Sequence, residues 1–350
     1  MEAVPRIRQS SEYAELKRRV RAAGLLETQP LYYWLKVVTV TILLAASVVG
    51  ALFLENTWAL VGVAIFFGFT DTQLGLLAHD VAHHQAFRGR RTNQVANLIL
   101  GNLLLAVSYS WWTQKHNQHH ATPNHMDEDP DVNFPMIVFD PAQIASKRRW
   151  LKPIIAIQAY AFITLLPFQS LNVRFHSVRH LFAAKARAPF IQGLAIVVHF
   201  ALYGLLLWTL GWPMGLLFFV VHQATFGLYN SSVFASNHKG MQMVRESDRL
   251  GFLREQILTT RNVKGQPVVD FWTGGLNYQI EHHLFPSMPR NKLREAQVVV
   301  REFCAEHKIP YYETGLFRSY KEILAHLNRA SASLRHGVKV PTPASAGLPD

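Results

Sequence analysis

The sequence predicts an all-α integral membrane protein: four transmembrane helices in two hairpins, with a cytosolic helical cap. Long apolar runs with few charges occur in two pairs, and each run has the length of a helix that spans a bilayer. Basic segments flank the pairs and indicate the cytoplasmic side by the positive-inside rule. Three short histidine clusters lie outside the apolar runs and account for eight of the 17 histidines.

The elements are predicted as follows in chain order. Residues 1–30 are polar and basic, and we expect a short interfacial helix on the cytosolic side. Residues 31–330 are predicted to form one domain. Its four spans are predicted at residues 37–54, 57–78, 190–210 and 214–234, which leaves residues 79–189 and 235–330 in the cytosol. Residues 331–350 are rich in Ala, Ser, Pro and Gly, a composition typical of a disordered tail.

Three ionisable side chains inside the predicted spans need an explanation. Asp71 is a functional candidate because acids are rare within spans, but an interfacial position near the cytosolic end of its run explains it equally well. His199 and His222 lie about two to three helical turns from the cytosolic ends of their spans. We expect these two histidines to form interhelical hydrogen bonds.

Residues 94–112 are the ambiguous element, because this run is also long enough to cross a bilayer. Crossing would place the histidine clusters before and after it on opposite sides of the membrane. Ligands of one site cannot be separated by a bilayer, so we expect this run to be buried or to lie in the interface. The same is expected of residues 152–168, which contain two prolines. Further helices are predicted at residues 291–307 and at about 320–329.

The histidine clusters are typical of a metal site. His79 and His83 are one helical turn apart, as are His116 and His120, so each pair presents its imidazoles on one helix face. Neutral imidazole binds iron, copper, nickel and zinc. Surface or core histidines could explain one cluster, but they explain three clusters poorly. One structural zinc ion needs about four ligands and usually includes cysteine, so eight histidines fit two metal ions better.

The motifs HDVAHH, HNQHH and QIEHH resemble the three histidine boxes of the membrane-bound fatty acid desaturases. The segment GGLNYQIEHHLFPSMPR, with Gln279 at the start of the third box, is most similar to the front-end (Δ5/Δ6-type) branch and its bacterial relatives. The segment Asn237-His238-Lys-Gly-Met is similar to the same branch. The resemblance extends from about Pro30 to Leu327. It implies that the cytosolic cap holds a non-haem di-iron site, which uses O2 and two electrons to desaturate a fatty acyl chain.

The resemblance also implies a set of metal ligands. Nine histidines are assigned to the two iron ions: His79, His83, His84, His116, His119, His120, His238, His282 and His283. His238 is included because it follows the last span closely and because Gln279 leaves the third box with two histidines. Four further side chains are expected to hydrogen-bond and orient the ligands: Asp80, Asn237, Gln279 and Glu281. The acidic run 127–131 is expected to be a solvated loop, with ligand orientation as its alternative role.

Two other functions are possible on the same residues. A hydroxylase, ketolase or acetylenase shares the histidine boxes and differs only in the fate of the acyl chain. A metal-binding transporter would place ionisable residues through the middle of several spans, whereas most histidines here cluster at one membrane face.

The expected partners follow from charge and cysteine content. The formal charge of +12 is explained by a basic cytosolic face near anionic lipid headgroups, and no nucleic-acid partner is expected. The expected substrate is a fatty acyl group linked to CoA, a carrier protein or a lipid. The single cysteine, Cys304, cannot hold an iron–sulfur centre, and no His-Pro-Gly-Gly motif of a cytochrome b5 domain occurs. Electrons are therefore expected from a separate ferredoxin, rubredoxin or cytochrome b5 with its reductase.

Overall fold

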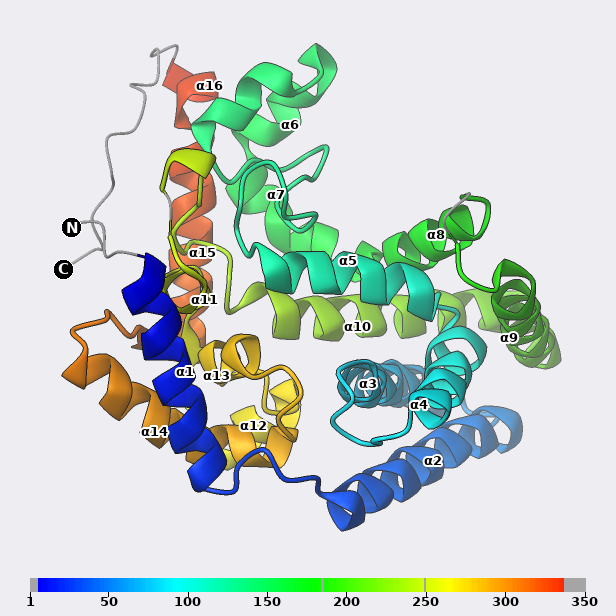
Figure 1. Ribbon diagram of the computed structural model, residues 1–350. Helices are drawn as coiled ribbons and strands as arrows, with labels where there is room; N and C mark the ends of the chain where they lie inside the picture. The colour runs from blue at the N-terminus through cyan, green and yellow to red at the C-terminus, as the bar shows by residue number, and fades with distance from the viewer. Residues whose placement is uncertain (1–5, 184–185, 249, 337–350) are drawn as a thin grey trace.

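The computed structural model describes residues 6–183, 186–248 and 250–336, and it is mostly helical (Figure 1). The helices are α1 Arg6–Ala22, α2 Pro30–Phe53, α3 Thr57–Ala82, α4 Arg90–Asn97, the π-helix η1 Leu98–Leu104, α5 Tyr109–Ala121, α6 Lys152–Ala156, α7 Gln158–Leu165, α8 Gln169–Leu181, α9 Pro189–Thr209, α10 Met214–Ala235, α11 Phe252–Leu258, α12 Pro267–Thr273, α13 Gln279–Leu284, α14 Leu293–Glu306, α15 Leu316–Ala330 and α16 Ala332–His336. The 3-10 segments are η2 Pro141–Ser146, η3 Arg149–Leu151, η4 Leu166–Phe168, η5 Glu246–Asp248 and η6 Arg290–Lys292. Two short strands, β1 Asn262–Val263 and β2 Glu313–Thr314, pair in parallel with Asn262 opposite Glu313.

The helices α2, α3, α9 and α10 occupy the four segments that were predicted to span a membrane. Among the described residues, α2, α3 and α9 are long and apolar enough to cross a bilayer. The helix α10 is not among them, and it carries the polar residues His222, Gln223 and Asn230. Only 17% of the most apolar window of α2 and 11% of that of α9 are buried inside the protein. Large exposed apolar surface of this kind is typical of helices that face lipid.

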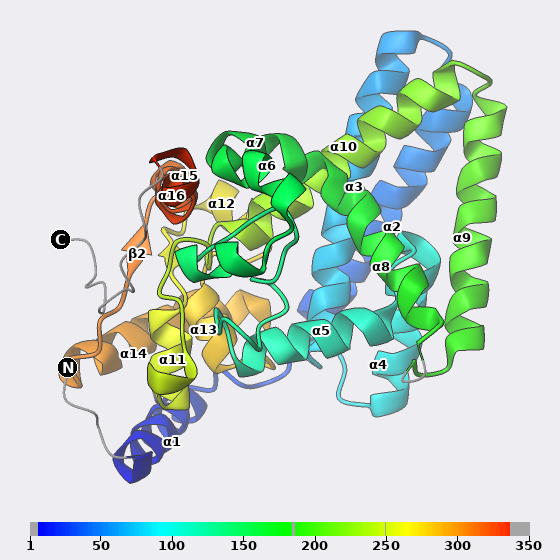
Figure 2. The same ribbon diagram turned by 90° about the horizontal axis from the view of Figure 1, so that it is seen from above.

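The two hairpins pack together through α3 and α10. A Cβ atom at Gly68 on α3 would lie 2.7 Å from the Cβ of Thr225 and 2.8 Å from the amide nitrogen of Phe226, both on α10. Glycine at this position therefore permits the close approach of the two helices. Figure 2 shows the turns of both hairpins at the same end of the bundle, away from the helices α1, α13, α14 and α15.

Two further apolar segments are sharply bent. The segment Arg90–Leu104 meets Tyr109–Ala121 at 108°, and Arg149–Ala156 meets Gln158–Leu181 at 89°. If each bent pair crossed the membrane, the chain would have up to five spans. The first bend falls inside residues 94–112, so this run is not one straight helix. A bend of this size is compatible with the expectation that the run is buried or lies in the interface.

The cap has its own apolar core, made by α1, α11, α13 and α14 around the third histidine box. Its fully or almost fully buried members include Leu16, Val20, Leu253, Ile257, Ile280, Leu284, Leu293, Val300 and Phe303. The N-terminal helix α1 contributes Leu16 and Val20 to this core, so it packs on the cap and is more than a basic interfacial segment. The Tyr13 hydroxyl adds a hydrogen bond to the carbonyl oxygen of Leu284, at 2.9 Å.

A double-glycine turn brings the third histidine box against α3. Gly274 and Gly275 have positive φ angles of 61° and 80°, a conformation that glycine adopts without the steric cost of a Cβ. A Cβ at Gly274 would lie 2.9 Å from the Cδ1 of Leu76 and 2.6 Å from the Nη1 of Arg290. The turn therefore fixes the distance between the cap and the bundle.

The C-terminal end corrects one expectation. The predicted disordered tail begins at residue 331, but Ser331 is buried and α16 continues to His336. The remainder of that tail, residues 337–350, lies outside the described residues. The predicted helices 291–307 and 320–329 correspond to α14 and to the second half of α15.

Candidate metal centre

Four separate parts of the chain deliver histidines to one place, where the bundle meets the cap. His79 lies in the last turn of α3, and His83 is the residue that caps it. The second box lies on α5, whose N-cap Ser108 accepts a hydrogen bond from the amide of Trp111 at 3.3 Å. His238 follows α10, and the third box forms the short helix α13. Every one of these segments ends or begins at the same end of the bundle.

The first group of histidines consists of His79, His83, His116 and His282. One nitrogen atom from each ring lies within 4.8 Å of the corresponding atoms of the others. The Nε2 atom of His116 is 3.2 Å from that of His79 and 2.9 Å from that of His83. His282 completes the group from the cap, with its ring centroid 4.8 Å from the ring of His79.

The second group consists of His119, His238 and His283, and it obeys the same 4.8 Å limit. The Nε2 atoms of His119 and His238 are 3.3 Å apart. His120 lies between the groups: its Nε2 atom is 3.1 Å from that of His116, and its ring stacks on His283 with centroids 4.1 Å apart.

One predicted ligand, His84, belongs to neither group. Its side chain is exposed and its backbone φ is 59°, in the left-handed region. The helix α3 has ended two residues earlier, so the chain turns at this point and separates His84 from its neighbour His83.

Burial keeps the imidazoles of the site uncharged. It lowers the pKa of His116, His120, His238, His282 and His283 well below the ordinary value, and the neighbouring histidines lower it further. A neutral imidazole has a free nitrogen lone pair, which is the form that binds a metal.

Several of the buried ring nitrogens have no hydrogen-bond partner among the described residues. They are Nδ1 of His79, His120 and His238, both nitrogens of His282, and Nε2 of His283. A buried polar atom without a partner costs about 1–3 kcal/mol. The Nε2 atoms of His79, His120 and His238 face the neighbouring histidines, so a cation in the groups would remove this cost for His283 Nε2 and for one nitrogen of His282. The two groups therefore fit two histidine-ligated metal ions.

Two further side chains orient ligands: Asp129, from the acidic run for which this was the alternative role, and Gln256, which the sequence did not single out. The Nδ1 of His119 lies 2.9 Å from Asp129 Oδ2, and the Nδ1 of His283 lies 2.8 Å from Gln256 Oε1. An N–H donated to such an acceptor fixes the ring orientation and leaves Nε2 for the metal. Asp129 is fully buried, so the expectation that residues 127–131 form only a solvated loop is wrong for this residue.

The four side chains that were expected to orient ligands behave differently from one another. Gln279 Nε2 lies 3.0 Å from His238 Nε2, and Asn237 donates to Gln279 Oε1 at 3.2 Å, so both are in place beside the second group. Asp80 lies 3.5 Å from His79 Nδ1, but it also pairs with Arg290 from the cap.

Glu281 faces away from the histidines. Its carboxylate accepts hydrogen bonds from Asn262 Nδ2 at 2.7 Å and from the Tyr311 hydroxyl at 2.8 Å. The pKa of the Glu281 carboxyl is raised to about 7, because the effect of burial outweighs the opposite effect of the hydrogen bonds from Asn262 and Tyr311. The side chains of Glu281 and His282 diverge because neighbouring helix positions point in different directions. Glu281 therefore ties the third box to the β1 strand and does not orient a ligand directly.

The histidines within the bundle form interhelical hydrogen bonds, as predicted. His222 Nε2 lies 3.0 Å from Asp71 Oδ2 on α3, and the Tyr203 hydroxyl on α9 lies 2.7 Å from His222 Nδ1. His199 Nδ1 lies 3.0 Å from the carbonyl oxygen of Leu103. Asp71 belongs to this network through its contact with His222. Only 2% of its surface is exposed, so it does not face solvent in the structure.

The chain is similar to proteins of known family. Residues 56–315 match the sequence profile of the family described as fatty acid desaturase. The chain is 30% identical over 338 residues to the Delta(6)-fatty-acid desaturase fat-3 of Caenorhabditis elegans, which covers 92% of this chain and 75% of that protein. It is 30% identical over 352 residues to the Delta(5) fatty acid desaturase fat-4 of the same organism, with coverage of 92% and 76%. It is 29% identical over 313 residues to the Delta(8)-fatty-acid desaturase of Euglena gracilis, with coverage of 86% and 74%.

Proposed function

The chain belongs to the fatty acid desaturase family, and from this membership we propose that it converts a CH2–CH2 unit of a fatty acyl chain into CH=CH. The single observation that carries the proposal is the convergence of seven histidines, from four parts of the chain, into two buried groups. This arrangement matches the need of the reaction for a redox metal centre, because no side-chain acid or base breaks an unactivated C–H bond.

We propose that two iron ions are the cofactor. His79, His83, His116 and His282 would hold one ion, and His119, His238 and His283 would hold the other. His120, between the groups, would complete one of the two sets. Bound iron would supply the oxidising chemistry with O2. The protein supplies the orientation: Asp129 and Gln256 hold the rings of His119 and His283 through Nδ1, and Gln279 lies beside His238.

The proposed reaction balances with O2 as oxidant. The acyl chain loses two hydrogen atoms, and O2 takes up these two hydrogens together with two electrons and two protons to give two molecules of water. The two electrons come from a separate electron-transfer protein. A hydroxylase would instead leave one oxygen atom on the acyl chain.

The proposed topology has four spans, α2, α3, α9 and α10, with the cap and the N-terminal helix α1 in the cytosol. It is supported by the antiparallel packing of the hairpins. It is also supported by the position, at one end of the bundle, of the segments that carry the histidines of the two groups. The basic residues Arg88, Arg90 and Arg91 directly after the first box favour the cytosolic side for that end.

An apolar hollow of about 420 Å³ between the bundle and the cap supports an acyl substrate. It is lined by Gly62, Ile65, Phe66, Phe69, Thr225, Tyr229 and Trp272. The packed side chains of Leu76, Val233 and Leu276 adjoin Phe69 of the hollow and Phe234, whose ring centroid is 6.2 Å from that of His79. We propose that the hollow accommodates part of the acyl chain.

Expression in a host that lacks the activity, followed by gas chromatography–mass spectrometry of total fatty acids, tests the proposal. The matched control is the His282→Ala variant, which removes a proposed ligand from the cap side of the first group. A new double bond that depends on His282 is the expected result. A new hydroxyl group would instead support the hydroxylase, and an unchanged profile in several hosts with electron donors present would contradict both enzymes.

A further inference from the structure

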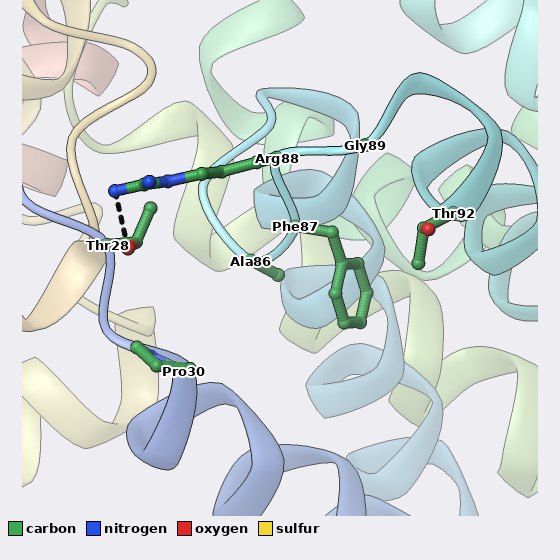
Figure 3. Close-up of a pocket in the computed structure, with 7 residues that line it drawn as sticks. All are labelled: Thr28, Pro30, Ala86, Phe87, Arg88, Gly89 and Thr92. Atoms are coloured by element: carbon green, nitrogen blue, oxygen red, sulfur yellow. Dashed lines mark hydrogen bonds between the residues drawn. The ribbon is translucent and has the colours of Figure 1, made fainter.

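A hollow of about 420 Å³ lies at the entrance of the bundle, outside the metal centre. It is lined by Thr28, Pro30, Ala86, Phe87, Arg88, Gly89 and Thr92 (Figure 3). One wall precedes α2, and the other is the loop that follows the first histidine box. The Arg88 side chain reaches across the hollow, and its Nη2 donates a hydrogen bond to Thr28 Oγ1 at 3.2 Å.

Among the described residues, no ion pair is formed by the arginines at this hollow, although the exposed Glu27 precedes Thr28. Arg88, Arg90 and Arg91 are all exposed. The ion pairs that the described residues form with arginine involve other positions of the chain. Within the described part of the chain, the side chain of Arg88 donates its hydrogen bond to the neutral hydroxyl of Thr28. Three cations beside one cavity therefore favour an anionic ligand.

The backbone adds neutral donors to the same place. The helix α4 begins at Arg90, and its N-cap Gly89 makes no side-chain cap. The first amides of a helix point towards its N-terminus and favour negative charge. A Cβ at Gly89 would lie 3.2 Å from Thr92 Oγ1, so the glycine also keeps this wall of the hollow open.

The hollow lies level with the start of the first apolar helix. Pro30 is the first residue of α2, and Leu31 and Trp34 follow with 70% and 62% of their surface exposed. Exposed tryptophan at the end of an apolar helix is typical of the headgroup layer of a bilayer. An anion held at this depth, beside exposed apolar side chains, has the chemistry of a lipid headgroup.

We propose that this hollow binds the phosphate group of a membrane phospholipid. Arg88 and the first amides of α4 bind the phosphate oxygens, and Thr28 holds the guanidinium in place. The acyl chains of the lipid lie along Leu31 and Trp34. The site goes beyond the desaturation reaction, because it requires neither iron nor turnover.

The proposal is tested by native mass spectrometry of the full-length protein in detergent, titrated with dihexanoyl-phosphatidylglycerol. Arg88→Gln is expected to weaken binding about tenfold or more, because a charge-assisted contact to phosphate is lost. Gly89→Val, which fills the hollow without changing the charge, is also expected to weaken it. The matched control is Arg149→Gln, which removes an exposed arginine beside the exposed Trp150 and is expected to leave binding unchanged.

Three results would overturn the proposal. Equal weakening by Arg88→Gln and Arg149→Gln would mean that general surface charge attracts the lipid. Equal binding of dihexanoylglycerol, which lacks the phosphate, would exclude phosphate recognition. Displacement of the lipid by equimolar CoA or inorganic phosphate would assign the site to a soluble phosphate. Iron content and melting temperature of each variant show that it is folded, and neither depends on desaturation, so failure here is distinct from failure of the proposed function.

Discussion

His238 is the proposed ligand that stands outside every histidine box. Its ring lies among those of His119 and His283, with centroid distances of 4.5 and 4.6 Å, and Gln279 contacts its Nε2 from the cap. Without His238 the second group would retain only two of its three histidines. His238, which lies just after the end of α10, therefore connects the bundle to the proposed second iron site.

Replacing His238 by alanine is expected to abolish most activity and to lower bound iron from about two ions to about one per chain, because the second group loses a ligand. His199→Ala and His222→Ala are the controls, since both side chains bond within the bundle, and they are expected to keep most iron and turnover. Iron is measured by atomic absorption and activity by fatty-acid profiling. Nearly full iron occupancy in folded His238→Ala protein would remove His238 from the ligand set.

Asp129 offers a second prediction at the scale of one side chain. Its carboxylate accepts from His119 Nδ1 and from the amide of Asn124, so it both orients the ring and fixes the loop. Asp129→Asn is expected to weaken iron binding about 10–100-fold, the usual effect of removing a residue that orients a ligand. The matched control is Asp127→Asn, an exposed carboxylate in the same run. Chelator competition measures the affinity, and equal affinities of the two variants would contradict the role of Asp129.

The sequence predicted the histidines of this site better than the residues around them. Spacing and resemblance identified the box histidines because their chemistry is unusual and local. Asp129 and Gln256 could not be identified with the same certainty, since one lies in an acidic run that looks solvated and the other is an ordinary polar residue of α11. Their roles depend on contacts between distant parts of the chain. The acidic run 127–131, for which ligand orientation was the alternative role, was the signal available in the sequence for Asp129.

At the scale of elements, the bent segment between the first two boxes decides whether a common site can exist. The π-helix η1 and the bend of 108° are compatible with the proposed topology, in which this segment does not cross the membrane. Buried polar contacts fix the bend: Asn102 Nδ2 donates to Gln192 Oε1 at 3.2 Å, and Ser108 Oγ donates to the same oxygen at 2.8 Å. Hydropathy alone could not distinguish such a segment from a crossing.

Cysteine labelling tests this geometry. Single cysteines at the exposed positions Gln94 and Glu128 are expected to react with a membrane-impermeant maleimide from the same side, because both flank boxes that share one site. A cysteine at Glu55, in the turn of the first hairpin, is expected to react only from the other side. The background is Cys304→Ser, although the native thiol is buried. Labelling of Gln94 and Glu128 positions from opposite sides would mean that residues 94–112 cross the membrane.

The long helices were predictable and the short ones were not, for a physical reason. The helices α2, α3, α9 and α10 lie where the apolar runs predict helices, although α2 begins earlier than residue 37, at Pro30, and α3 continues past residue 78, to Ala82. Short helices such as α12 and α13 are set by the double-glycine turn and by packing on the cap core, which no local pattern encodes. The helix α1 reads as a basic surface segment, yet Leu16 and Val20 are completely buried.

At the scale of the whole molecule, the bundle and the cap are joined by a buried polar network beside the metal centre. Arg290 from the cap pairs with Asp80 and donates to the carbonyl oxygen of Leu76, both on α3. The Tyr33 hydroxyl on α2 accepts from the amide of Arg290 at 3.3 Å and donates to Gln85 at 2.9 Å. These contacts hold the third box against the first one. The two halves of the proposed ligand set therefore depend on the docking of cap on bundle.

The supply of electrons provides a further test of the proposed reaction. Each turnover of the proposed reaction needs two electrons, whereas the chain has one cysteine, which is buried in the cap core and cannot hold an iron–sulfur centre. We expect purified protein with iron, O2, an acyl substrate and NADPH to give no multiple turnovers. Addition of a ferredoxin, rubredoxin or cytochrome b5 with its reductase is expected to start turnover, measured as unsaturated product per iron. Each donor system without the chain is the control. Sustained turnover by the isolated chain with NADPH alone would show that electrons reach the centre without a partner.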